Sequence, residues 1–424
     1  MKRKLFILTT MVAALLFMGC QDNNNPTVKG NGKPAQIDYI RTPHPETADS
    51  AIVEAEKLQT IVIVGSNLQA VNQILFDDIE ASLNPAYITE KTILLTVPFS
   101  EKRTKLLSLF TSDNLRTDYD FTTFIPAPKL NSLKCEYVPD GDIAQIRGSY
   151  FYEPLTVWFR TGANGADSIE AEITAFDGNN ISVVVPTGAE EGALTVQSKY
   201  GQSVSKFRFR DHTGLITDCN IEFNASGKRW GNPWEIGLWG DAEPCDGGYM
   251  LFKREQVGEW FWSQEDLAGC YWDCYDAIKT PYLPAESDLT LYGLRFEANV
   301  KTWTDLPMHI WFASGKEEFG MGNDGATDTP QAHWCPWLVA GDATSGEWTV
   351  QEYKTDGWET FTIPLTEFKY DKLGRFSTDG QTGLLMGDMS KYMNLNFMIF
   401  GMQCDKNSKH DIELYLDNPR LVKL

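Results

Sequence analysis

Two stretches of the sequence repeat one order of strand signals, about 85 residues apart. In each stretch an apolar, β-branched run leads into a glycine, at Gly65 and again at Gly148, and a later run ends in Val-Pro, at Pro98 and again at Pro186. Such runs, bounded by glycine and proline, predict strands. A repeat of this length is too long for a solenoid unit and corresponds to one small β-sandwich. The sequence therefore predicts an all-β protein with tandem immunoglobulin-like β-sandwiches.

A larger β-rich segment follows the repeats. We expect the two sandwiches at residues 35–127 and 128–211, and the third segment at residues 212–424. The third segment contains several runs of strand-forming residues, at 289–298, 308–312, 359–364, 395–400 and 412–422. Runs of this length and spacing predict a two-sheet sandwich of single-domain size. The last run resembles the final strand of jelly-roll carbohydrate-binding domains, so we expect a jelly-roll-like β-sandwich.

Tryptophan is concentrated in this third segment. Of the 13 Trp, only Trp158 precedes residue 230, and the other 12 lie between Trp230 and Trp358. Core packing alone does not require that asymmetry. A pyranose ring has an apolar face of C–H bonds and a rim of hydroxyls, and Trp and Tyr offer flat, rigid, amphipathic surfaces that cover such a face. The distribution indicates polysaccharide binding by the third segment.

The candidate binding residues are aromatic side chains in loop-like surroundings. Trp239 and Trp272 stand among Gly, Asp and turn residues, where burial is difficult, and Trp337 follows a proline. The full candidate set is Trp239, Tyr271, Trp272, Trp337, Trp262 and Trp334. Core packing is the alternative, because alternate residues of a strand share one face. We expect it for the tryptophans inside strand-like runs, namely Trp303, Trp311, Trp348 and Trp358.

The chain is strongly acidic. It has 37 Lys plus Arg against 58 Asp plus Glu, a formal net charge of −21. Nucleic-acid binding needs a basic surface that displaces phosphate counterions, and anionic lipid headgroups attract basic segments. The charge therefore excludes nucleic acid as a partner and is consistent with a neutral glycan.

The first twenty residues resemble a bacterial lipoprotein signal sequence. Three basic residues precede an apolar run that is too short to span a bilayer comfortably as a helix, and Gly19 then precedes Cys20. The resemblance implies that residues 1–19 are a signal peptide, and that Cys20 carries the lipid. Residues 20–34 then form a flexible tether. An ordinary signal peptide that happens to contain a cysteine is the alternative.

The other cysteines do not form a recognisable framework. If Cys20 is acylated, seven remain, and an odd number cannot all pair. Cys270 and Cys274 do not have CxxC spacing, and His333 and Cys335 are the one close pair of zinc-ligand types. We expect buried free thiols rather than a zinc site. Residues 323–328 offer oxygen ligands for a structural calcium ion, with a solvated turn as the alternative, and no other cofactor is expected.

The domain order resembles a known family. The strand signatures and a terminal strand with Tyr200-Gly201 resemble IPT/TIG modules. A lipoprotein with tandem modules of this kind and a Trp-rich last sandwich resembles the SGBP-B-like surface glycan-binding proteins of Bacteroidetes polysaccharide-utilisation loci, whose last domain is of xyloglucan-binding type. The resemblance implies a non-catalytic protein, lipid-anchored in the outer membrane and facing the exterior. It would capture a plant-type β-glycan, such as xyloglucan or β-glucan, beside a SusC/SusD-like transporter complex.

The same resemblance implies a role for particular aromatics. In that family an adjacent Tyr-Trp pair supports the glycan backbone, and Tyr271-Trp272 is the matching pair, with Trp239 upstream. We expect the chain to act as a monomer.

Two other function classes stay open. A glycoside hydrolase needs two carboxylates close together, and residues 234–241 weakly resemble the Glu-x-Asp-x-x-Glu motif of β-glucanases, with Glu235 at its first acid. Gly237 and Gly240 stand where that motif has its other two acids, so we expect no enzymatic activity. A protein-binding surface adhesin would suit immunoglobulin-like modules but does not explain 12 Trp in one segment.

Overall fold

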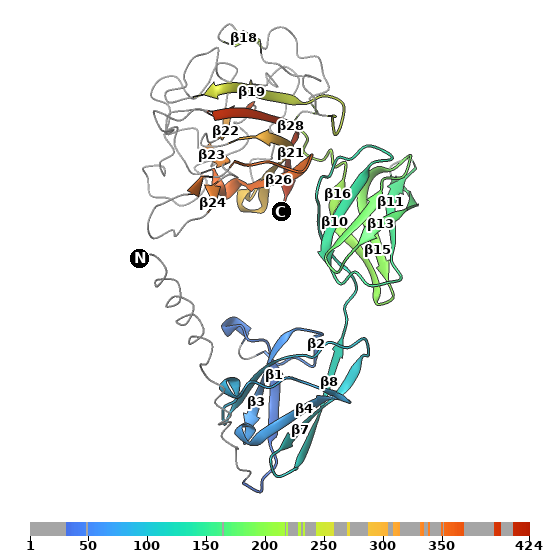
Figure 1. The fold of residues 1–424 in the computed structure, drawn as a ribbon, viewed down its shortest axis with the longest axis vertical. Coiled ribbons are helices and arrows are strands. Elements are labelled where there is room, and N and C mark those ends of the chain that lie inside the picture. Colours follow the sequence, from blue (N-terminus) through green and yellow to red (C-terminus); the bar gives the residue numbers. More distant parts are fainter. Residues whose placement is uncertain are drawn as a thin grey trace, which may run out of the picture. The chain divides into compact units, whose positions relative to one another are not determined.

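The computed structural model describes the two repeats and much of the third segment (Figure 1). The described residues are 31–47, 50–162, 165–216, 218, 243–257, 287–303, 352–368 and 410–424, together with the short strands between these ranges. Their regular elements are β-strands and short 3₁₀ turns, which confirms the all-β prediction. Within them, no helix has the length and apolar character needed to cross a bilayer. The expected signal peptide, Cys20 and most of the tether lie outside the described residues.

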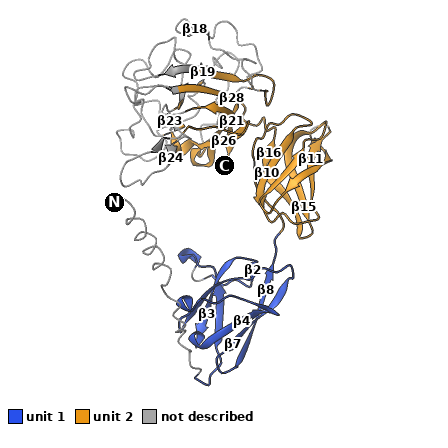
Figure 2. Cartoon of the chain, viewed as in Figure 1, with its two compact units in different colours: residues 1–126 blue, residues 127–424 orange. Residues whose placement is uncertain are grey.

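The chain divides into two compact units, residues 1–126 and 127–424 (Figure 2). The first unit holds the first repeat. The second unit holds both the second repeat and the third segment. The expected boundary after residue 211 therefore separates two sandwiches inside one compact unit and remains a prediction, as does the boundary after residue 127.

The first unit is a sandwich of two sheets, with strand orders β1-β3-β6 and β2-β8-β7-β4-β5. The strand bounds are β1 Gln36–Arg41, β2 Glu54–Glu56, β3 Thr60–Ser66, β4 Val71–Phe76, β5 Ile79–Glu80, β6 Thr92–Thr96, β7 Thr104–Thr111 and β8 Arg116–Phe124. Short 3₁₀ turns are η1 Pro45–Thr47, η2 Leu68–Ala70 and η3 Pro85–Tyr87. Ile61 and Ile63 of β3 face Leu107 and Leu109 of β7 in a shared buried core, because alternate strand residues point to one face.

The second repeat is also a two-sheet sandwich, with strand orders β13-β14-β10-β9 and β12-β11-β15-β16. The strand bounds are β9 Lys129–Leu133, β10 Ile143–Ser149, β11 Thr156–Thr161, β12 Asp167–Ala171, β13 Ile173–Phe176, β14 Asn180–Val184, β15 Glu190–Ser198 and β16 Gly201–Phe209. Its core is lined by Ile146, Phe159, Val183 and Val196. The four strand signatures of the sequence thus correspond to β3, β6, β10 and β14.

The two glycines that mark the repeat have the same structural cause. A Cβ at Gly65 would overlap the backbone carbonyl oxygen of Gln36 in the neighbouring strand β1. A Cβ at Gly148 would overlap the backbone carbonyl oxygen of Lys129 in the neighbouring strand β9. Each glycine therefore permits one close approach of two backbones, which no larger residue allows without a shift of the strand.

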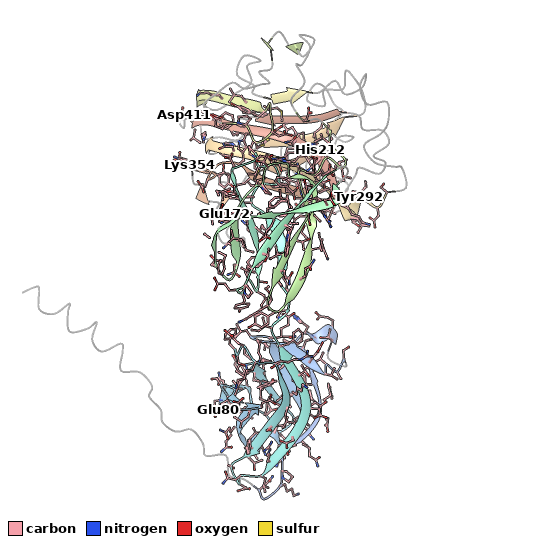
Figure 3. All side chains as sticks on the ribbon, turned by 90° about the vertical axis from the view of Figure 1, so that its right-hand side faces the viewer. Glu80, Glu172, His212, Tyr292, Lys354 and Asp411 are labelled. Atoms are coloured by element: carbon pink, nitrogen blue, oxygen red, sulfur yellow. The ribbon has the colours of Figure 1, made fainter. Side chains whose placement is uncertain are left out.

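The third segment contains two four-stranded sheets, with orders β19-β28-β21-β26 and β20-β27-β22-β23. The bounds are β19 Met250–Val257, β20 Gly269–Tyr271, β21 Tyr292–Thr302, β22 Met308–Ala313, β23 Gln331–Trp334, β26 Glu359–Pro364, β27 Asn394–Ile399 and β28 His410–Lys423. Shorter elements are β17 Lys228–Arg229, β18 Asn232–Pro233, β24 Leu338–Val339, β25 Thr349–Val350, η6 Leu289–Leu291 and η7 Leu365–Glu367. Figure 3 shows the described side chains, with Tyr292 and Asp411 labelled near the first residues of β21 and β28. All five strand runs expected from the sequence of this segment are present.

A buried charge network joins the last two sandwiches. Glu136, three residues after β9, accepts hydrogen bonds from Arg420 of β28 at 2.6 Å and from Arg295 of β21 at 2.8 Å. Arg420 is fully buried and also donates to both carboxylate oxygens of Glu297, at 2.7 and 2.9 Å. Thr360 donates to Glu297 and accepts the backbone N–H of Glu136. Two guanidinium groups thus oppose two carboxylates, which offsets part of the desolvation cost of burying them.

Candidate functional site

The adjacent Tyr-Trp pair begins at the end of a strand. Tyr271 is the last residue of β20, and its backbone pairs with Asn396 of β27. Since β20 is the outer strand of the sheet β20-β27-β22-β23, the backbone of Tyr271 lies at an edge of that sheet. The side chain of Tyr271 lies outside the described residues, as do Trp272, Trp239, Trp262 and Trp337. Their roles remain predictions.

Trp334 is a core residue, which corrects its assignment to the glycan platform. Its side chain is 7% exposed. Its ring centroid lies 4.9 Å from that of Phe296, 5.1 Å from Trp303 and 4.8 Å from Phe361. A ring enclosed by three aromatic neighbours has no face left for a sugar. The physical reason is that Trp334 is the last residue of β23 and pairs with buried Met308, whereas its sequence neighbours indicated a loop.

Two of the tryptophans expected in the core are described with their side chains. Trp303 is fully buried in the core of the last sandwich, as predicted. Trp358 is half-buried and packs against the core of the second sandwich, although it belongs to the third segment. Its indole Nε1 donates a hydrogen bond to the backbone oxygen of Glu243 at 2.7 Å. Trp358 therefore lies at the junction of the two sandwiches.

A second buried group extends the charge network at this junction. The thiol of Cys245 donates to Oδ2 of Asp417 at 3.4 Å, and Oδ1 of Asp417 accepts the backbone N–H of Asn418 at 2.7 Å. Burial, with a smaller contribution from the charge of Glu297, raises the pKa of Asp417 well above its usual value. Burial likewise raises the pKa of the Cys245 thiol. Both groups are thereby favoured in their neutral forms beside the ion pairs.

The free-thiol prediction is confirmed for the two cysteines whose side chains are described. Cys135 and Cys245 are both free and buried. The other cysteine side chains and the candidate calcium segment, residues 323–328, lie outside the described residues. In the described part of the chain, no group of three or more His, Cys, Asp or Glu is placed to hold a metal ion. Residues 234–241, which carry the hydrolase alternative, are also outside it.

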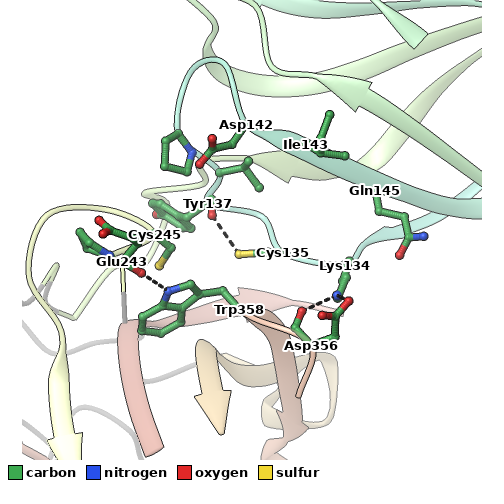
Figure 4. Close-up of a pocket in the computed structure, with 13 residues that line it drawn as sticks. Lys134, Cys135, Tyr137, Asp142, Ile143, Gln145, Glu243, Cys245, Asp356 and Trp358 are labelled. Atoms are coloured by element: carbon green, nitrogen blue, oxygen red, sulfur yellow. Dashed lines mark hydrogen bonds and ion pairs between the residues drawn. The ribbon is translucent and has the colours of Figure 1, made fainter. Parts of the chain in front are cut away.

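A cleft between the second and last sandwiches was not indicated by the sequence. It is lined from one side by residues 134–145 and from the other by residues 243–245, Asp356 and Trp358 (Figure 4). The contributing positions are far apart in the chain: Lys134 and Asp356, which form an ion pair across the cleft, differ by 222 positions. No local motif carries such a site, so sequence reasoning could not find it.

Two immunoglobulin-like sandwiches followed by a Trp-rich sandwich are the architecture of a modular binding protein. Residues 209–423 match the family described as "Surface glycan-binding protein B xyloglucan binding domain". That match covers half of the chain, and the chain belongs to the surface glycan-binding protein B family. The resemblance drawn from the strand signatures and tryptophans is therefore confirmed.

Two known proteins are similar to the chain. The chain is 28% identical over 231 residues to an IPT/TIG domain-containing protein of Bacteroides ovatus, an alignment that covers 50% of this chain and 46% of that protein. The chain thus aligns with about half the length of this curated relative. The crystal structure of the surface glycan-binding protein PbSGBP-B from Prevotella bryantii is similar with a TM-score of 0.58 and 23% identity, covering 92% of this chain and 99% of that chain. This second similarity shows the shared fold.

Proposed function

We propose that the protein captures a plant-type β-glycan, such as xyloglucan or a β-glucan, for import by a polysaccharide-utilisation system. The observation that carries the proposal is the coincidence of three features in one segment. Residues 209–423 match the xyloglucan-binding domain of the family, contain two four-stranded sheets, and hold 12 of the 13 Trp. The flat faces of a β-glycan suit aromatic stacking, and a glycan without charge is not repelled by an acidic protein.

The glycan platform in this proposal consists of Tyr271, Trp272, Trp239, Trp337 and Trp262. Tyr271 supplies the structural support, because it is the last residue of the outer strand β20. Trp334 is excluded because its ring faces are covered in the core.

Binding in this proposal is not accompanied by catalysis. Glycoside hydrolysis needs an acid and a second carboxylate in a defined pair. Around Trp234 and Trp239, the places of two of the three motif acids are taken by Gly237 and Gly240. A segment that lacks those acids retains the aromatic surface for binding and loses the groups for bond cleavage.

The proposal includes a cellular location. Lipidated Cys20 holds the chain in the outer membrane, facing the exterior, and the residues that follow it connect this anchor to the first sandwich. The last residues of the expected tether belong to that sandwich instead, since the backbone N–H of Gly32 donates to Asp113 and the side chain of Asn67 donates to the Lys33 carbonyl, each at 2.8 Å. A SusC/SusD-like transporter complex then receives the captured glycan. Weak binding by each monomer is sufficient, because a long polymer engages many anchored copies at once.

Affinity electrophoresis tests the proposed function. The chain from residue 21 onward is run through native gels that contain xyloglucan, mixed-linkage β-glucan or mannan. We expect retardation by at least one β-glucan, and loss of that retardation in Trp272→Ala. Trp158→Ala, which removes a half-buried indole from the second sandwich, is the matched control and should still be retarded.

Two outcomes contradict the proposal. Unchanged mobility of the wild type in all three polysaccharides would exclude glycan capture. Release of reducing sugar from the same polysaccharides would instead establish the hydrolase alternative.

A further inference from the structure

The cleft at the junction has the composition of a small saccharide site. Its volume is about 210 Å³, and it opens to solvent. One wall is the indole of Trp358, and the opposite wall includes Cys135 and Tyr137 (Figure 4). Asp142 and Gln145 add polar side chains from the second sandwich. An aromatic wall with a few convergent polar groups, at the boundary of two domains, is the usual composition of a small-ligand site.

The aromatic wall is rigid. The Trp358 indole is fixed by the hydrogen bond from Nε1 to the Glu243 backbone oxygen. It also contacts Tyr249 and Tyr415, whose ring centroids lie 5.8 and 6.4 Å from its own. Both tyrosines are fully buried, so the contact anchors Trp358 to the last sandwich. A ring held in this way loses little entropy when a sugar stacks on it.

The polar groups of the cleft are available to a ligand. Among the residues that the structure describes, the side chains of Asp142 and Gln145 make no hydrogen bond, whereas the ammonium of Lys134 is held 2.9 Å from Asp356. A carboxylate accepts hydrogen bonds from hydroxyls, and an amide both donates and accepts. Among the described residues that line the cleft, Asp142, Glu243 and Asp356 are acidic and Lys134 is the one basic residue. This balance favours a neutral polyol over an anion.

The cleft is also preformed. It exists only where the second and last sandwiches meet, and the Glu136–Arg420 and Glu136–Arg295 ion pairs fix that meeting. A backbone hydrogen bond also joins the two sandwiches, since the N–H of Thr360 donates to the Lys134 carbonyl at 2.8 Å. A site built on a locked junction needs no closure on binding, which lowers the cost of association.

We propose that this junction cleft binds one sugar ring of a glycan, as a second site distinct from the Tyr271–Trp272 platform, with Trp358 as its stacking surface and Asp142 and Gln145 as hydroxyl partners. The inference rests on the proposed function, because it takes the same class of ligand. It extends that function by giving the second immunoglobulin-like sandwich a direct part in binding. Two sites on one chain raise the effective affinity for a polymer that reaches both.

Fluorine NMR on protein labelled with 5-fluorotryptophan tests the site. Trp358→Phe identifies the Trp358 signal, and a xyloglucan oligosaccharide is titrated into the whole chain. We expect the Trp358 signal to shift with ligand. In Asp142→Ala/Gln145→Ala, the ligand concentration for half of that shift should rise about tenfold, since two polar partners are lost. Glu170→Ala/Gln197→Ala removes an exposed carboxylate and an exposed amide from the same sandwich and should leave the titration unchanged.

The outcomes separate the two proposals. A static Trp358 signal while other Trp signals shift overturns the cleft and supports the platform. A Trp358 shift that is the same in Asp142→Ala/Gln145→Ala also overturns the cleft, because the shift is then transmitted from elsewhere. If no Trp signal moves with any β-glucan oligosaccharide, the proposed function and the cleft both fail.

Discussion

Nη2 of Arg420 lies 2.6 Å from Oε2 of Glu136, although the two residues are 284 positions apart. Arg420 is fully buried and the Glu136 side chain is 3% exposed. A lone guanidinium in that environment would be strongly unfavourable. The second immunoglobulin-like sandwich therefore supplies a counter-ion that the last sandwich needs, and the two are energetically coupled.

Loss of that counter-ion should destabilise the chain. We expect Glu136→Gln to lower the free energy of unfolding of residues 127–424 by about 3 kcal/mol, since removal of one partner leaves buried charge uncompensated. Urea denaturation followed by tryptophan fluorescence measures the change. Glu170→Gln, at an exposed position of the same sandwich, should change stability little. Equal stability of Glu136→Gln and wild type would show that Glu297 alone neutralises Arg420.

Separation of the two sandwiches should also lower the stability of the last sandwich. A fragment of residues 212–424 lacks Glu136, so Arg295 loses the carboxylate that it pairs with and Arg420 retains Glu297. We expect it to unfold at a lower temperature than a fragment of residues 128–424, in which both sandwiches should unfold in one calorimetric transition. Two well-separated transitions in the longer fragment would contradict the coupling.

The buried carboxyl of Asp417 should make stability depend on pH. Burial raises its pKa above the usual 3.8, so the native state holds a proton that the unfolded chain has released. The stability contributed by this group is full below the unfolded pKa and is lost as the pH rises through the folded pKa. Asp417→Asn does not ionise, and its stability relative to wild type should therefore increase as the pH rises from about 4.

Asp177 provides a control of opposite sign. Hydrogen bonds from the backbone N–H of Asn179 and from Asn180 lower its pKa. Its contribution is present above the unfolded pKa and is lost as the pH falls. Denaturation of Asp417→Asn and Asp177→Asn at several pH values should give opposite trends relative to wild type. A constant difference for Asp417→Asn would contradict the assignment.

Gly148 should not tolerate a side chain. A Cβ there overlaps the Lys129 carbonyl oxygen and forces β9 away from β10, so we expect Gly148→Ala to cost about 2 kcal/mol or more. Gly178→Ala is the matched control, because a Cβ at Gly178 has no atom within 4 Å. Thermal unfolding of the two variants measures the difference. Similar melting temperatures would mean that β9 shifts without loss.

Trp334 and Trp272 should respond differently to truncation. We expect Trp334→Ala to lower the free energy of unfolding by about 3–5 kcal/mol, because it leaves a cavity among Phe296, Trp303 and Phe361. Trp272→Ala should instead reduce glycan retention with a small effect on unfolding. A Trp334→Ala variant as stable as wild type would contradict its core position.

The sequence predicted the strands well, because their signals are local. The run before Gly65 and the run that ends at Pro364 coincide with β3 and β26. Trp334 was assigned wrongly, since β23 has four residues and so short a strand shows no clear alternation. The junction was not predictable, because Glu136 and Trp358 gain their roles from partners far away in the chain. The platform residues after Tyr271 lie outside the described structure and remain predictions.

The order of strands around β28 has a consequence for biosynthesis. In the sheet β19-β28-β21-β26, β28 pairs with both β19 and β21, yet it follows every other strand of the sheet in the chain. On a ribosome, β19 and β21 must wait for β28 before either the sheet or the Arg420 network forms. Until then an apolar face and unpaired strand edges are exposed, and such edges promote aggregation. The last sandwich therefore cannot complete this sheet until the chain through β28 is present.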